Sequence, residues 1–390
     1  MMLIRLLIFF LLILVLPTFF IYRKYISKMS NRVVKLLFWL PTLLIIIVMA
    51  YILISYEPSP RSIRVLANFI IFFLCYTVPQ ILFTLMILFM MLFHKITGLK
   101  INGEYIGGAI AIIALGYIIY GGTYGKRDFQ VREVTTTFRK LPPEFNGYKI
   151  VQISDLHSGS WTDKGKALSK VVRIVNKQNP DLIVFTGDLV NNLAYEVTPF
   201  MKILSGLKAK DGVYSVLGNH DYSPYVKWNS EKAKKENMDE LKSYEAQMGW
   251  RLLNNENVKL RKGNDSIALI GVENSGRPPF PDYGNLPKAL KGTGKMFKVL
   301  LSHDPTHWRR EVLPKSDVNL MLSGHTHNMQ TSIFGFSPAK FVYDEYDGLY
   351  SQGDRKLFVN IGLGYVMFPL RIGARPEITV ITLSDGKGKR

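Results

Sequence analysis

The chain has 390 residues, a formal net charge of +19 and one cysteine, Cys75, which excludes both a disulfide framework and a thiolate metal cluster. The first 125 residues hold ten basic and only two acidic residues, and the mean hydropathy of the whole chain is +0.10. These values exclude a chain that is soluble throughout, and they also exclude a disordered one. The basic residues are scattered rather than gathered in one stripe, so the charge does not indicate nucleic acid.

Four apolar stretches near the N-terminus are each long enough, or nearly so, for the roughly 20 residues with which a helix crosses a bilayer. They cover residues 6–22, 36–56, 65–93 and 105–120. A cleaved signal peptide would account for the first stretch but not for the other three. None carries an Asp, Glu, Lys or Arg well inside it, which favours an anchor over a transporter. We therefore predict an all-α transmembrane domain with four spans over residues 1–121.

The basic residues between these stretches predict an orientation. One side of the membrane would carry seven, namely Arg23, Lys24, Lys28, Arg32, Lys35, Lys95 and Lys100. The other side would carry six, namely Arg5, Arg61, Arg64, Lys126, Arg127 and Arg132. The margin is small, but the first five form one cluster between the first two stretches. We therefore expect that loop to be cytoplasmic and the rest of the chain to lie outside the cytoplasm.

A linker and leading strand over residues 122–147 precede a region of ordinary globular composition, 148–385. Runs rich in Val and Ile predict eight strands there, at 148–153, 181–186, 213–217, 267–272, 298–301, 318–322, 357–361 and 378–383. Helical periodicity is clearest over 164–179 and 230–247. Strands that alternate with helices in this way predict a layered α/β domain.

Five of the predicted strands end in polar clusters, and these clusters hold five of the seven histidines. Their polar residues are Asp155 and His157; Asp188, Asn191 and Asn192; Asn219, His220 and Asp221; His303 and Asp304; and His325 and His327. Alone, Asp-x-His and Gly-Asp are more typical of a turn or a helix cap, and a lone His303 is more typical of a buried core histidine. Gly-Asn-His-Asp and Gly-His-Thr-His are harder to explain in that way. Because ligands bind beyond the C-terminal ends of strands in α/β sheets, five such clusters predict one shared site. Carboxylate, imidazole and amide oxygen ligands suit Mn, Fe, Zn or Mg, and there are enough of them for two ions.

In this order, the clusters resemble the motifs of the calcineurin-like metallophosphoesterase superfamily: Asp-x-His, Gly-Asp-x-x-Asn, Gly-Asn-His-Asp, a lone His and Gly-His-x-His. The resemblance covers about residues 148–385 and implies a four-layer α-β-β-α sandwich of two mixed sheets. It also implies two metal ions. One would be held by Asp155, His157, Asp188 and His327, and the other by the bridging Asp188 with Asn219, His303 and His325. His220 would be catalytic, as a general acid or charge stabiliser, with a neighbouring carboxylate such as Asp221 orienting its ring.

Three downstream segments, 360–364, 369–371 and 375–378, resemble the bacterial membrane-associated branch of this superfamily. Some members of that branch hydrolyse the pyrophosphate of UDP-2,3-diacylglucosamine. The chain departs from the branch at Asn328 and Met329, where two glycines are common, and these side chains reshape the mouth of the site. Arg277 is either a phosphate contact or an ordinary exposed arginine. Five aromatic residues either line an apolar mouth or belong to core and surface, namely Phe336, Phe341, Tyr343, Tyr346 and Tyr350.

We therefore expect a membrane-anchored, metal-dependent phosphoesterase that hydrolyses a phosphodiester or pyrophosphate bond of a lipid-linked or envelope substrate. The expected setting is the bacterial inner membrane, with the catalytic domain outside the cytoplasm, membrane lipid as a partner, and neither nucleic acid nor an obligate protein partner. Two alternatives stay open. One is a phosphomonoesterase, including a protein phosphatase. The other is a catalytically silent membrane scaffold, although such relatives usually lose ligands and this chain retains all seven positions and His220.

Overall fold

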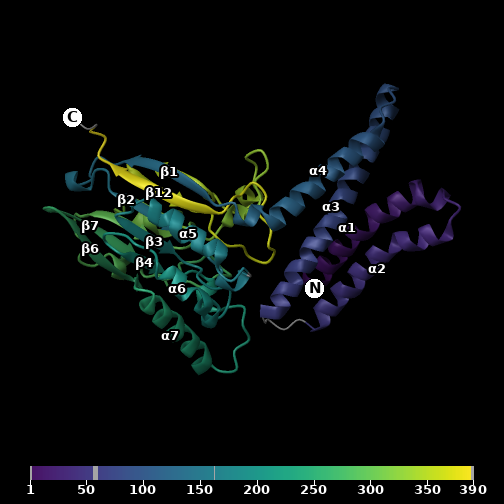
Figure 1. Cartoon of the computed structure of the whole chain (residues 1–390). Coiled ribbons are helices and arrows are strands. Elements are labelled where there is room, and N and C mark those ends of the chain that lie inside the picture. Colours follow the sequence, from purple (N-terminus) through teal and green to yellow (C-terminus); the bar gives the residue numbers. More distant parts are fainter. Residues whose placement is uncertain (1, 56–59, 162, 388–390) are drawn as a thin grey trace. The chain divides into compact units, whose positions relative to one another are not determined.

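The computed structural model describes residues 2–55, 60–161 and 163–387 (Figure 1). Residue contacts divide the chain into two compact units. A helical unit comprises Met1–Tyr124 with Met367–Leu370, and an α/β unit comprises Gly125–Val366 with Arg371–Arg390. Residue 56, at which the second predicted span ends, and residues 388–390 of the tail lie outside the described residues.

The helical unit consists of four long apolar helices, as the sequence predicted. They are α1 (Met2–Lys24), α2 (Arg32–Ser55), α3 (Pro60–Thr97) and α4 (Gly103–Thr123). Each contains a segment that is long and apolar enough to cross a membrane. Many of their large apolar side chains face outward. Among the residues whose burial the structure describes, few apolar ones are buried: a cluster of Leu14, Ile45 and Phe73, together with Ala67, Ile87 and Ile118. Such an outward-facing apolar surface suits lipid as the surrounding solvent.

Polar contacts join the helices to one another. Thr18 of α1 donates a hydrogen bond to Gln80 of α3 (2.9 Å), and Thr42 of α2 shares one with Tyr76 of α3 (2.7 Å). Glu104, at the start of α4, accepts a hydrogen bond from Tyr25 (2.9 Å), which directly follows the end of α1. This contact places the α1–α2 and α3–α4 loops at the same end of the helical unit.

The α/β unit contains two six-stranded mixed sheets. Sheet A has the order β1-β12-β2-β3-β4-β5, and sheet B has the order β10-β11-β9-β8-β7-β6. The strands of sheet A are β1 (Gln130–Thr137), β12 (Glu377–Ser384), β2 (Lys149–Ile153), β3 (Leu182–Thr186), β4 (Val213–Val216) and β5 (Trp250–Leu252). Those of sheet B are β10 (Gly348–Gln352), β11 (Arg355–Val359), β9 (Leu320–Ser323), β8 (Phe297–Leu301), β7 (Asp265–Gly271) and β6 (Glu256–Lys262). In each sheet four neighbouring strands are parallel: β2 to β5 in sheet A, and β7, β8, β9 and β11 in sheet B.

Strand alternation divides the buried side chains among three cores, because successive residues of a strand point to opposite faces. In β3, Leu182 and Val184 belong to the core between the sheets, whereas Ile183 and Phe185 belong to the core beneath the helices that cover sheet A. In β8, Leu300 belongs to a third core on the outer face of sheet B. The resulting order of layers is helix, sheet, sheet, helix, which confirms the predicted four-layer sandwich.

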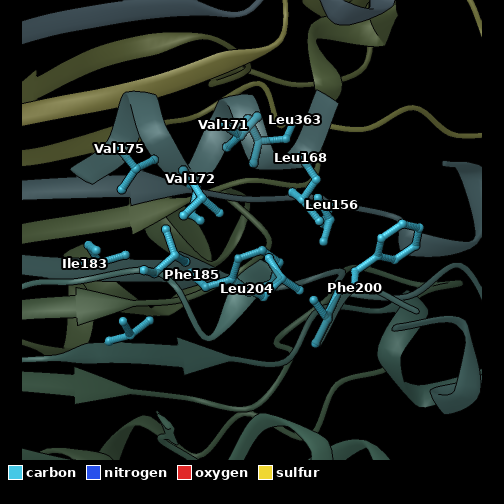
Figure 2. Packing of buried hydrophobic residues seen from close by; sticks show 14 of the residues in the cluster. Leu156, Leu168, Val171, Val172, Val175, Ile183, Phe185, Phe200, Leu204 and Leu363 are labelled. Atoms are coloured by element: carbon cyan, nitrogen blue, oxygen red, sulfur yellow. The ribbon is translucent and has the colours of Figure 1, made fainter. Parts of the chain in front are cut away.

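Helices cover the outer face of each sheet. On sheet A these are α5 (Lys166–Lys177), α6 (Met201–Leu204) and α7 (Glu231–Gln247), and Figure 2 shows Val171, Val172 and Val175 of α5 above Phe185. These valines recur at helical spacing and give α5 one apolar face. On sheet B the cover consists of α8 (Leu286–Ala289), a π-helical turn at Trp308–Val312 and α9 (Leu313–Lys315).

The sequence patterns did not predict three strands, β5, β6 and β10, and all three lie at sheet edges. Strand β5 has only three residues, and β6 reads Glu-Asn-Val-Lys-Leu-Arg-Lys, with two buried residues among seven. Edge strands pair on one side only and tolerate charged residues, so their sequences lack the apolar run that identified the inner strands.

Candidate metal centre

Seven polar side chains meet beyond the C-terminal ends of five parallel strands. They come from the loops after β2, β3 and β4 of sheet A and after β8 and β9 of sheet B: Asp155, His157, Asp188, Asn219, His303, His325 and His327. Parallel strands end at one edge of a sheet, and the two packed sheets present these edges side by side. The structure therefore brings all seven predicted ligands into one site.

Two of the carboxylates anchor the cluster. His327 Nε2 lies 3.2 Å from Asp155 Oδ1 and 3.0 Å from His157 Nε2. Asp188 Oδ2 lies 3.6 Å from His157 Nε2 and 3.2 Å from His303 Nε2. Asp188 is thus the carboxylate between two groups of histidines, which is the position expected for a bridging ligand.

Three overlapping groups could each hold a metal ion: Asp155, His157 and His327; His157, Asp188 and His220; and Asp188, His303 and His325. Within each group the ligand atoms all lie within 4.8 Å of one another. Asn219 Oδ1 is buried and meets no hydrogen-bond donor among the residues that the structure describes. An unsatisfied buried acceptor is costly, and a cation would remove that cost. Oxygen and imidazole donors in this arrangement fit divalent metal ions.

Five of the seven ligand positions have a left-handed backbone. Their φ values lie between 48° and 75°, at Asp155, His157, Asp188, His325 and His327. For residues other than glycine this conformation costs about 1–2 kcal/mol each. The residues persist in it because the strand ends and the loop hydrogen bonds determine the path of the backbone. Concentrated backbone strain of this kind is typical of functional sites.

The glycines before Asn219 and His325 allow a close approach that no other residue permits. A Cβ atom on Gly218 would lie 2.2 Å from Asp188 Oδ1. A Cβ atom on Gly324 would lie 2.3 Å from Asp155 Oδ2. Because these neighbours are candidate ligands, any side chain at either glycine would displace a ligand.

The buried charges shift one another's pKa values. Burial opposes charge on Asp188, but His303 and His220 outweigh it and hold the pKa of Asp188 well below its usual range. Burial likewise opposes charge on His303, yet Asp188 raises its pKa to about 10. For His157, burial and the neighbouring His220 lower the pKa well below its usual value, which favours the neutral ring that a metal requires.

His220 lies at the edge of the cluster, with its ring centroid 4.8 Å from that of His157. Its Nδ1 contacts the Asn191 carbonyl oxygen at 2.7 Å, so the backbone of the loop after β3 orients the ring. Asp221, the carboxylate expected to have this role, makes its contacts elsewhere. It accepts hydrogen bonds from the backbone N–H groups of Asp188 (2.8 Å), Leu189 (2.8 Å) and Gly218 (2.8 Å). Asp221 therefore ties together the two loops that carry Asp188 and Asn219.

Aromatic side chains surround the site. The Tyr343 hydroxyl lies 3.2 Å from His325 Nε2, which leaves Nδ1 of His325 as its candidate ligand atom. The Phe280 ring packs edge-on against His325, and the Tyr225 ring packs against His220. Arg277 is exposed, and its backbone N–H donates a hydrogen bond to Asp304, next to His303 (3.3 Å). Arg277 therefore lies near this rim of the site.

The remaining predicted aromatic residues either lie on the surface or support the ligand loop. Phe336 and Phe341 are exposed, whereas the Tyr350 hydroxyl accepts a hydrogen bond from the Tyr346 backbone N–H (3.0 Å). The Tyr346 carbonyl in turn accepts one from Thr326 (2.7 Å), between His325 and His327. Tyr346 and Tyr350 thus support the ligand loop rather than line an opening.

Arg371 is a fully buried residue of the site whose role the sequence analysis did not foresee. Its guanidinium donates to the carbonyl oxygens of Gly364 (2.8 Å) and Ile361 (2.8 Å) and lies 3.0 Å from His327 Nδ1. Burial lowers the pKa of Arg371 to about 10. The guanidinium positions the His327 ring with Nδ1 toward Arg371 and Nε2 toward Asp155, on the side where a metal ion would bind. The only sequence signal was its place in the Pro-Leu-Arg segment of the resemblance.

Comparison with known proteins shows which family the chain resembles. Residues 148–329 match the family model described as calcineurin-like phosphoesterase. The chain is 31% identical over 297 residues to the uncharacterized metallophosphoesterase YkuE of Bacillus subtilis, covering 72% of this chain and 97% of that protein. It is 31% identical to a transmembrane protein with metallophosphoesterase domain of Danio rerio, covering 73% of this chain and 64% of the relative. A solved structure of the sulfate thiohydrolase SoxB of Thermus thermophilus also matches, with a TM-score of 0.36 and 13% identity over 63% of this chain and 58% of that one.

Proposed function

Because the chain belongs to the calcineurin-like phosphoesterase family, we propose that it is a membrane-anchored, two-metal hydrolase of phosphodiester or pyrophosphate bonds. The observation that carries the proposal is the convergence of seven ligand side chains from two sheets around Asp188. Divalent cations held there would activate a water and withdraw charge from the phosphoryl oxygens. The four apolar helices would form the membrane anchor.

His220 is the residue that would handle the proton of the leaving group. Its Nδ1 is directed to the Asn191 carbonyl, so Nε2 is the nitrogen left to face a substrate. When the P–O bond breaks, Nε2 of the doubly protonated ring would give its proton to the leaving oxygen. Asn191 holds the ring in this orientation, and Asp221 holds the loops on which both groups lie.

The rim of the site supports a diester over a monoester. Tyr225, Phe280 and Tyr343 place aromatic rings beside the histidines, and such rings can accommodate the second ester substituent that a diester carries. Arg277 would contact a phosphate oxygen from the same rim. A phosphomonoesterase is the alternative enzyme, and a silent scaffold is the non-enzymatic one.

A diester assay separates these alternatives. Purified full-length protein with Mn²⁺ should hydrolyse bis-p-nitrophenyl phosphate faster than p-nitrophenyl phosphate, and EDTA should abolish both rates. The His220→Asn variant should lose at least about a hundredfold of the diester rate. His94→Asn, at the exposed end of α3, is the matched control and should keep it. A faster monoester rate would favour the phosphomonoesterase, and no hydrolysis with Mn, Fe, Zn or Mg would favour the scaffold.

The substrate class depends on which side of the membrane the α/β unit occupies. We propose the side opposite the cytoplasm at a bacterial inner membrane, because the cluster of five basic residues precedes and opens α2. That side favours a lipid or envelope phosphodiester, whereas a cytoplasmic site would favour a UDP-linked lipid precursor. Alkaline phosphatase fused after Tyr124 or after residue 390 should be active. Inactive fusions, with an active cytosolic reporter at the same positions, would reverse the orientation.

A further inference from the structure

An exposed apolar loop follows the metal ligands directly. Residues 331–343, here called the aromatic loop, begin four residues after His327. Their exposed apolar side chains are Ile333, Phe334, Phe336, Phe341 and Val342. Phe334 is 103% exposed and Phe341 is 75% exposed. Single exposed apolar residues are ordinary, but five within ten residues form a patch, and such patches mark interaction sites.

The tip of the loop displays Phe334 at a conformational cost. Ile333 and Phe336 exchange two backbone hydrogen bonds of 2.9 Å, which closes a two-residue turn. Its central residues, Phe334 and Gly335, have φ values of 51° and 79°. Turns of this kind favour Asn-Gly, whereas a bulky residue at positive φ is an outlier. Phe334 therefore neither packs in a core nor favours the turn. A role for its exposed apolar ring in binding would explain why a phenylalanine stands there.

Hydrogen bonds join the loop to the surroundings of the metal ligands at both ends. Ser332 donates a backbone hydrogen bond to Ile372 (2.7 Å), and the hydroxyl of Ser337 donates to the Asn328 carbonyl (2.9 Å). At the far end, the Tyr343 hydroxyl contacts His325 (3.2 Å). Whatever the loop binds is consequently held beside the metal ligands.

A lysine gives the patch a charge that suits anionic lipid. The Lys340 ammonium lies 4.4 Å from the centroid of Phe336 and 5.3 Å from that of Phe341, and these two rings pack edge-on. A cation among exposed aromatic residues is the composition of segments that lie in the lipid–water interface. The chain also supplies four apolar helices and a net charge of +19, so a bilayer is the apolar partner always available to it.

We propose that the aromatic loop inserts into the lipid–water interface and holds the metal centre against head-group phosphates, so that the substrate stays embedded in the bilayer during hydrolysis. The part of this inference that concerns the substrate rests on the proposed phosphoesterase function. The part that concerns contact between the loop and the membrane does not. Phe334 and Phe341 enter the interface, and Lys340 lies at the level of the lipid phosphates.

Fluorescence in lipid nanodiscs tests the membrane contact without reference to activity. In full-length protein with Cys75→Ser, an environment-sensitive dye is attached at Phe334→Cys. The matched control carries the dye at Asn264→Cys, exposed in the turn between β6 and β7, at the opposite end of sheet B from the metal centre. Phosphatidylcholine–phosphatidylglycerol discs with head-group-proximal nitroxide lipid should quench the dye at 334 about twofold or more and leave that at 264 unaffected. Equal quenching at both positions would overturn the proposal. A change in dye fluorescence at 334 that appears only when a disc holds two copies of the protein would also overturn the proposal. It would identify a self-association surface.

The substrate part is tested with Phe334→Asn, which supplies the residue that the turn prefers and removes only the apolar ring. The readout is the ratio of hydrolysis rates for a fluorescent phosphodiester lipid in the discs and for soluble bis-p-nitrophenyl phosphate. Loss of the ring should lower this ratio about tenfold, and loss of Phe341 as well should lower it further. An unchanged ratio would overturn the proposal that the substrate stays embedded in the bilayer. Absence of hydrolysis in the wild type would instead refute the phosphoesterase function and leave the quenching result standing.

Discussion

In the helical unit the large apolar side chains face outward and the buried positions include threonines, whereas in the α/β unit the apolar side chains fill three cores. Ile54 of α2 is 85% exposed, while Ile183 of β3 is fully buried. Thr18 and Thr42 are buried between helices and are hydrogen-bonded there. Both arrangements follow one rule, since polar groups removed from water must find partners and apolar groups avoid water. The difference lies in the solvent that surrounds each unit.

The units also differ in the charge that they bury. Between the helices, the buried polar residues are uncharged threonines, among the residues whose burial the structure describes. In the α/β unit Asp155, Asp188 and His303 are buried within one site. Burying the two carboxylates together is costly unless cations compensate them, as His303 does for Asp188 and as metal ions would do further.

The largest effect should follow from removing the central carboxylate. Asp188→Asn should lower the diester rate at least about a thousandfold, because it removes the candidate bridging ligand, while the amide oxygen can still accept the His220 backbone N–H (2.8 Å). Asp239→Asn, an exposed carboxylate on α7, is the matched control and should keep the wild-type rate. The unfolding temperature without metal should also fall, because His303 loses the carboxylate that compensates its buried charge at 3.2 Å. Mn²⁺ binding measured by calorimetry is therefore the deciding readout, and an unchanged affinity would show that Asp188 is structural.

The next effect concerns Glu245 of α7, a buried carboxyl that accepts a hydrogen bond from Ser215. Burial raises its pKa from the ordinary 4.5 to about 8. The protonated form therefore stabilises the fold below about pH 4.5, and this contribution is lost as the pH rises through 8. Glu245→Gln should match the wild type at pH 4.5 and gain on the order of 3 kcal/mol in unfolding free energy by pH 8. Denaturant titration of the α/β unit at both pH values checks this, and an equal difference at both would contradict it.

Replacing a glycine by alanine should affect metal binding in the α/β unit and not in the helical unit. Gly218→Ala should weaken metal binding roughly ten- to hundredfold, measured by calorimetry with Mn²⁺, because its Cβ would lie 2.2 Å from Asp188 Oδ1. Gly116→Ala in α4 is the matched variant, since its Cβ meets nothing within 4 Å. Alanine there should leave metal binding unchanged and favour the helix slightly. Equal effects of the two variants would refute the close approach at Gly218.

The smallest effect is expected inside the helical unit. Thr42→Val removes the hydrogen bond to Tyr76 while preserving the shape of the side chain. Hydrogen bonds between membrane helices contribute about 0.6 kcal/mol on average, so helix unfolding in bilayer-mimetic micelles should shift by about that amount. Metal binding by the same protein should not change. A loss of several kcal/mol would show that the helical unit depends on polar contacts as strongly as the α/β unit does.

The sequence identified those parts of the molecule that local patterns determine. The four apolar stretches and the eight inner strands were readable, because a helix suited to lipid and a strand buried on both faces each leave a continuous run of apolar residues. The polar clusters were equally readable, since the ends of parallel strands meet at one edge. The α-β-β-α layering followed from the resemblance, and the structure confirms it.

Only the tertiary structure decided which groups orient the ligands. The carbonyl that faces His220 belongs to Asn191, the guanidinium beside His327 belongs to Arg371, and Asp221 binds backbone N–H groups instead of the histidine next to it. Neither local composition nor periodicity records such contacts, because they join side chains to backbone groups of other loops. Positive φ values at Asp155 and four other candidate ligands cannot be predicted from the sequence either. They arise because the packed strand ends determine the path of each loop. The residues at these positions have the side chains that a metal ion would need, although their type does not favour this backbone conformation.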